Sequence, residues 1–141
     1  MGREIIVCAF LLYHSICDIK SRKIYIPICV IFAAVGLIVF VMGSRKQILS
    51  LIGGILCGVC LMLLSYFTEE GIGMGDGYVV TAVGIWSGGE KTFAALMGGL
   101  FLAAVFGILR VCTGKADGKT EFAFVPFLMS AYVSLVLGNA V

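Results

Sequence analysis

Charged side chains are scarce in this sequence of 141 residues. Lys, Arg, Asp and Glu make up only 13% of it, whereas the apolar set AVILMFWYC makes up 61%, and the mean hydropathy is +1.13. A soluble domain of this size needs more polar side chains to cover its surface, and a disordered chain has far less apolar content. Both classes are therefore excluded, and the composition predicts a protein that meets lipid.

Neither basic nor acidic residues are in large excess. Ten basic residues stand against eight acidic ones, for a net charge of +2, and no basic stripe of the kind that binds nucleic acid is present. Histidine is almost absent. His14 is the single one, and the Cys57/Cys60 pair lies inside an apolar run with no second pair. We therefore expect neither a nucleic-acid partner nor a metal or other cofactor.

Long uncharged stretches are what the sequence has instead. They cover residues 5–17, 24–44, 47–68, 77–89, 92–109 and 122–141. A helix needs about 20 mainly apolar residues to cross a bilayer. The first and fourth stretches are shorter, so they must recruit flanking residues, which include Asp18 and Asp76. We predict an all-α membrane protein, a polytopic bundle of six transmembrane helices formed by residues 1–141 as a single domain.

The basic residues predict the orientation of these six spans. Six of them follow the first or fifth span, and four lie on the other side. Because basic residues concentrate in cytoplasmic connections, we expect the side with six to face the cytoplasm. The connections that hold Asp18 and Asp76 share this side. We expect residues 1–17 to form a first span rather than a signal peptide, because no small-residue cleavage site follows.

Two carboxylates differ from the other acidic residues. Asp18 directly closes an apolar run, and Asp76 lies in a glycine-rich segment with no basic residue within ten positions. Charge near a bilayer is costly and tends to mark a functional site. A glycine-rich turn without a catalytic role is the alternative. If the two acids meet, repulsion keeps one protonated while the other is ionised, which is the arrangement that activates water in aspartic proteases.

Three sequence motifs carry a family resemblance. Gly73-Met74-Gly75-Asp76 resembles the GxGD signature of intramembrane aspartic proteases, and residues 71–88 around it resemble type IV prepilin peptidases. Asp18, followed by basic residues, is similar to the first aspartate motif of that family. Residues 122–128, with their Pro-Phe-Leu sequence, resemble its last helix.

The resemblance implies an aspartic endopeptidase of the cell membrane with Asp18 and Asp76 as the catalytic pair. Gly73 and Gly75 would shape the backbone beside the second acid. Such enzymes cut the basic leader of prepilin or pseudopilin precursors on the cytoplasmic face, without a metal. The chain resembles the short form that lacks a soluble methyltransferase domain.

Three further expectations concern residues near these motifs. Glu69 and Glu70 precede Asp76 with no base in their connection, so we expect them to attract a basic leader. His14 shares a helical face with Asp18; a hydrogen bond to that acid is one alternative, and we expect a packed or interfacial histidine instead. Glycine pairs at 53–54 and 98–99 predict close helix packing.

A membrane protein without enzymatic activity is the competing class. A small transporter or a structural subunit can also keep a membrane-buried acid, which binds an ion or a proton. Such a protein needs only one of the two aspartates.

Overall fold

The computed structural model describes residues 2–21, 24–42, 48–67, 73–113 and 123–138. Within these ranges the chain forms six α-helices and no strand, so the predicted all-α class is confirmed. The helices are α1 Gly2–Ser21, α2 Ile26–Met42, α3 Ile48–Phe67, α4 Met74–Ser87, α5 Gly89–Cys112 and α6 Val125–Gly138. Each helix corresponds to one of the uncharged stretches.

The helices differ in their capacity to cross a bilayer. By length and composition, α3 and α5 qualify among the described residues, with 20 and 24 residues. Helices α2 and α6 are apolar but shorter. Two of the described helices are thus long and apolar enough to cross a membrane, and the arrangement of six spans stays a prediction.

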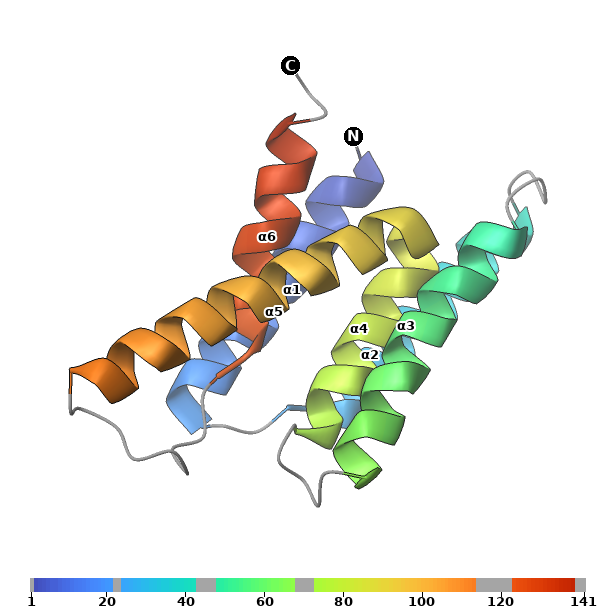
Figure 1. Ribbon diagram of the computed structural model, residues 1–141. Coiled ribbons are helices and arrows are strands. Elements are labelled where there is room, and N and C mark those ends of the chain that lie inside the picture. The colour runs from blue at the N-terminus through green and yellow to red at the C-terminus, as the bar shows by residue number, and fades with distance from the viewer. Residues whose placement is uncertain (1, 22–23, 43–47, 68–72, 114–122, 139–141) are drawn as a thin grey trace.

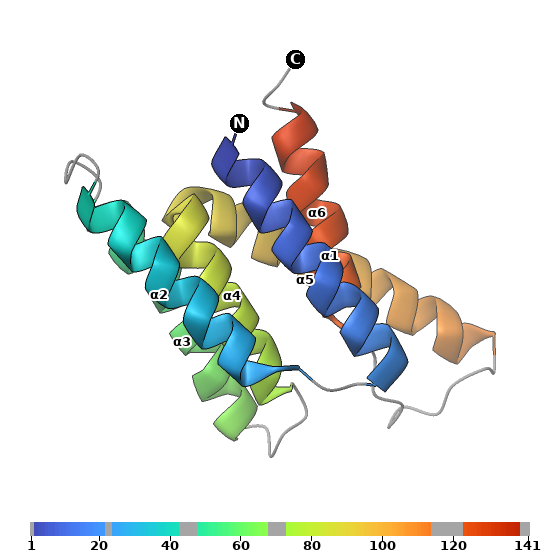
Figure 2. The same ribbon diagram turned by 180° about the vertical axis from the view of Figure 1, so that it is seen from behind.

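The bundle has two distinct ends. Helix α1 lies beside α6, and α4 lies beside α3 and α2, while α5 crosses the bundle at a steep angle (Figures 1 and 2). At one end α1 and α3 finish and α4 and α6 begin (Figure 1). We call this the aspartate end, because Asp18 and Asp76 lie there. At the opposite end α1 begins and α4 turns into α5.

Helix α4 forms the centre of the core. Its Val79, Val80 and Val83 are at most 1% exposed, and Leu11 of α1 and Tyr132 of α6 are equally buried. These side chains belong to one continuous apolar cluster. The acid in the first turn of α4 is therefore carried by the most enclosed helix of the fold.

Glycines allow the helices around α4 to approach closely. Gly54 of α3 faces the backbone of Gly84, and Gly58 of α3 faces Thr81, so that a side chain at either glycine would collide with α4. At Gly99 of α5, an added Cβ would lie 3.0 Å from the Leu128 Cα of α6. The predicted role of the glycine pairs in helix packing is confirmed at these positions.

Candidate functional site

Asp18 lies in the last turn of α1 and points into the protein. It is only 7% exposed, and its Oδ2 accepts a hydrogen bond from the backbone N–H of Val125 at 3.2 Å. Val125 is the first residue of α6. The N–H groups of a first helical turn have no partner within the helix, and the positive end of the helix dipole favours a nearby anion. The start of α6 thus holds the Asp18 carboxylate.

Asp76 lies in the first turn of α4 and is 8% exposed. Its backbone N–H donates to the Gly73 carbonyl at 3.0 Å, which closes the turn that starts the helix. A Cβ at Gly73 would lie 3.4 Å from the Asp76 Oδ2. The missing side chain at Gly73 therefore leaves one side of the carboxyl group free of a neighbouring side chain.

Gly75 brings the two aspartate motifs together. A Cβ at Gly75 would lie 2.8 Å from the Ile24 Cδ1, and Ile24 comes shortly after Asp18 in the sequence. Two positions further along, Gly77 packs against Met62 of α3. The first turn of α4 is thereby wedged between α3 and the segment that follows the first motif.

The two carboxyl groups lie at the same end of the bundle. Asp18 is in the last turn of α1 and Asp76 is in the first turn of α4, and the end of α1 and the start of α4 lie at one end of the bundle (Figure 1). Both are more than nine-tenths buried. In surroundings with little water, two such groups cannot both ionise easily, so the site is suited to hold one proton between them.

His14 does not take part in this site. It is fully buried, its Nδ1–H donates to the Phe10 carbonyl at 3.1 Å, and its Nε2 accepts from the Cys29 thiol at 3.3 Å. Both ring nitrogens therefore have partners other than Asp18. The prediction of a packed histidine is confirmed.

The acidic pair expected to attract a basic leader cannot be placed. Glu69 and Glu70 lie outside the residues that the structure describes. Within the described ranges, no three His, Cys, Asp or Glu side chains gather as they do at a metal site.

The contact with Val125 is the feature of the site that sequence reasoning missed. A backbone N–H carries no side-chain signal, but Pro126 directly after it is one. Proline is favoured in the first turn of a helix, where its missing N–H has no partner to lose. Pro126 therefore marks the start of α6, and Val125 supplies the free donor there.

Comparison with known proteins identifies the family. Neither the curated proteins nor the solved structures contain a match to the chain. The sequence profile of the type IV leader peptidase family matches residues 5–111, a range that includes both aspartates and ends within α5, before α6. The chain therefore belongs to the type IV leader peptidase family and is a peptidase.

Proposed function

We propose that this protein is a membrane-embedded aspartic endopeptidase that removes the basic leader of prepilin-like precursors. The observation that supports the proposal is the placement of Asp18 and Asp76. The acids come from α1 and α4, are both buried, and belong to helix turns that lie at the same end of the bundle (Figure 1). No other pair of buried carboxylates occurs among the described residues.

The hydrogen bond from α6 distinguishes the roles of the two acids. The Val125 N–H and the start of α6 stabilise Asp18 as an anion. We therefore assign Asp18 as the ionised general base and Asp76 as the protonated acid. Asp18 takes a proton from water while the water oxygen attacks the scissile carbonyl carbon, and Asp76 donates its proton toward the carbonyl oxygen. Asp18 then passes its proton to the leaving amine as the C–N bond breaks, and Asp76 takes its proton back from the hydroxyl formed on the carbonyl oxygen, which restores the pair.

The glycines next to Asp76 suit a peptide substrate. A scissile peptide must bring its backbone close to both carboxyl groups, and a side chain at Gly73 would occupy space beside Asp76. Peptide hydrolysis at two carboxyl groups requires no metal, because the pair supplies both the base and the acid. The acidic Glu69 and Glu70 stand next to this site in the sequence and would attract a basic leader.

The surface of the bundle favours a position within the bilayer. Large apolar side chains point outward on several helices, among them Ile5 of α1 (69% exposed), Leu49 of α3 (85%) and Phe101 of α5 (68%). An apolar surface of this extent is unfavourable in water but matches lipid. We propose a multi-pass arrangement of six spans in the cell membrane, with the aspartate end facing the cytoplasm as the basic residues indicate.

A cleavage assay tests this function. The full chain is purified in detergent and incubated with a precursor that has a basic leader and an apolar helix, and the product is identified by gel shift and mass spectrometry. We expect cleavage by the wild type and a loss of at least about 10³-fold for Asp18→Asn and for Asp76→Asn, since each removes one proton-transfer group.

Asp117→Asn is the matched control, because Asp117 stands between Lys115 and Lys119 in a charged connection and belongs to neither aspartate motif. It should cleave like the wild type. Cleavage retained by either of the two buried-acid variants would contradict the mechanism. If the wild type cleaved other membrane peptides but no precursor with a basic leader, this result would contradict the proposed substrate.

A further inference from the structure

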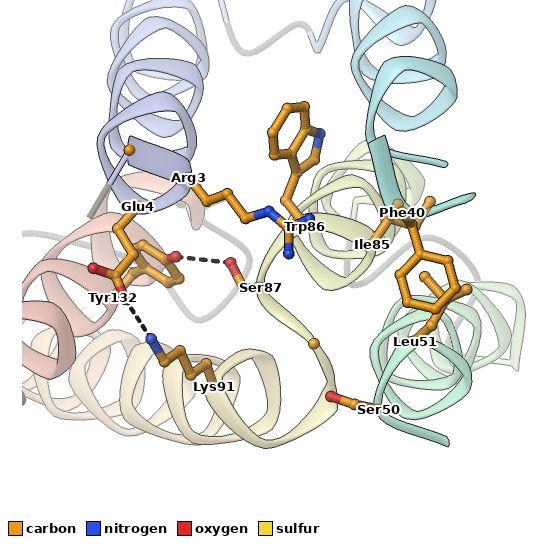
Figure 3. A pocket seen from close by; sticks show the side chains of 12 residues that line it. Arg3, Glu4, Phe40, Ser50, Leu51, Ile85, Trp86, Ser87, Lys91 and Tyr132 are labelled. Atoms are coloured by element: carbon orange, nitrogen blue, oxygen red, sulfur yellow. Dashed lines mark hydrogen bonds and ion pairs between the residues drawn. The ribbon is translucent and has the colours of Figure 1, made fainter. Parts of the chain in front are cut away.

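A polar cavity lies at the end of the bundle opposite to the aspartates. It has a volume of about 540 Å³ and is bounded by the start of α1, the end of α4, the start of α5 and the middle of α6 (Figure 3). Since the cavity is lined by the last residues of α4, Ile85 to Ser87, a rise of 1.5 Å per residue places it about 15 Å from Asp76 along the helix. The cavity is therefore separate from the catalytic pair.

Polar side chains from distant parts of the sequence meet in this cavity. Glu4 forms an ion pair with Lys91, and the Ser87 and Tyr132 hydroxyls are 2.7 Å apart and hydrogen-bonded. The Arg3 side chain extends between α1 and α4 toward Trp86 and Ser87 (Figure 3). Among the described residues, Arg3 has neither an ion pair nor a hydrogen bond.

The charges in the cavity leave one positive charge in excess. Arg3 and Lys91 are the basic residues in its lining, and Glu4 is the acidic one. Because Glu4 is already paired with Lys91, the guanidinium group of Arg3 is the charge available to a ligand. Guanidinium groups bind phosphate and carboxylate through paired N–H donors, so the cavity favours an anionic group.

An apolar groove of about 610 Å³ adjoins this cavity. Leu49, Gly53 and Cys57 line it from α3 at a spacing of four residues, which places them along one face over about 12 Å. Phe93 lines it from α5. Ser50 borders both spaces, and its Oγ accepts the Gly89 N–H at 3.2 Å. A charged cavity thus opens beside an apolar channel that runs along the helices.

We propose that the cavity and the groove together bind one anionic phospholipid. Its phosphate contacts Arg3, and one acyl chain lies along the groove between α3 and α5. Glu90 also lines the groove and repels a phosphate there, which directs the headgroup to the cavity. This inference rests on the membrane position in the proposed function but not on the aspartate chemistry. The bound lipid would join the starts of α1 and α5 to α4 and α6.

Lipid binding is measured directly by native mass spectrometry of the purified full chain. The protein is titrated with phosphatidylglycerol and with phosphatidylcholine of the same acyl chains. We expect about a tenfold preference for phosphatidylglycerol, which corresponds to one charge-assisted contact. Arg3→Ala should remove the preference, and Arg3→Lys should keep part of it. Lys20→Ala removes a basic residue at the aspartate end and should leave the preference unchanged.

A second variant tests the groove. Cys57→Phe fills it and should weaken the binding of both lipids severalfold, while unchanged fluorescence of Trp86 confirms that the bundle is intact. Equal binding of the two lipids by the wild type, an unchanged preference in Arg3→Ala, or full lipid binding by Cys57→Phe would overturn the proposal. Displacement of the lipid by millimolar inorganic phosphate would assign the cavity to a free anion and overturn it too. None of these readouts uses cleavage, so they are independent of the proposed mechanism.

Discussion

Substitution of two adjacent glycines in α3 should have different effects on stability. Gly53 and Gly54 have the same helical surroundings in sequence but face different neighbours. A Cβ at Gly54 would lie 2.8 Å from the Gly84 Cα and closer still to the carbonyl of Gly84. A Cβ at Gly53 would lie 3.4 Å from the Gly89 Cα, which is an ordinary contact.

The magnitudes follow from these contacts. At Gly54 the obstacle is backbone, which no change of rotamer can relieve, so α3 and α4 must separate. Overpacking of this kind costs about 1–3 kcal/mol, and Ala gains at most about 1 kcal/mol over Gly in a helix. We therefore expect Gly54→Ala to lower the free energy of unfolding by about 1–2 kcal/mol. For Gly53→Ala we expect no loss, or a gain of up to about 1 kcal/mol.

Trp86 provides the assay. It is the single tryptophan of the chain, it lies in α4, and its Nε1–H donates to the Phe32 carbonyl of α2 at 2.9 Å. Its fluorescence during titration of mixed micelles with SDS therefore reports whether α4 stays docked. Equal stability of the Gly53→Ala and Gly54→Ala proteins would refute the close α3–α4 contact.

Three further outcomes are expected from the site. Gly75→Ala should reduce cleavage about tenfold, since its methyl group meets Ile24. The double variant with Ile24→Ala should recover most of that loss. A comparison of initial rates checks both expectations. Reversal of both Glu69 and Glu70 to Lys should raise KM for a basic-leader substrate with little change in kcat, and an unchanged KM would remove their proposed role. The pH profile of kcat/KM should be bell-shaped, because cleavage is lost when both acids are protonated at low pH and when both are ionised at high pH. A flat profile across the acidic and neutral range would contradict the shared proton.

The number of helices could be predicted because charge is scarce in their interiors. The short first and fourth stretches also correctly predicted that their helices extend to Asp18 and Asp76, but the exact helix ends could not be predicted. The first uncharged stretch stops at residue 17, yet α1 continues to Ser21 and includes Asp18. Likewise α4 starts at Met74 and includes Asp76. A break defined by charge alone therefore places the helix ends a few residues too early or too late.

Contacts between helices that are far apart in the sequence could not be predicted from it. The motifs indicate that Asp18 and Asp76 act together, but nothing in them indicates that the start of α6 binds one of the two. Glu4 and Lys91 stand 87 positions apart in the sequence, whereas the structure pairs them across the bundle. Such pairs depend on how α1 packs against α5 and α6, and helix periodicity does not encode that packing.

The central claim is that Asp18 and Asp76 act as one unit, and a double-mutant cycle tests it most directly. The kcat for a basic-leader precursor is measured for the wild type, Asp18→Asn, Asp76→Asn and the double variant. Residues that act together show strongly non-additive losses, so we expect the double variant to be no slower than the slower single variant. Losses that multiply, with each single variant retaining measurable cleavage, would mean that the two acids act independently and would contradict the account.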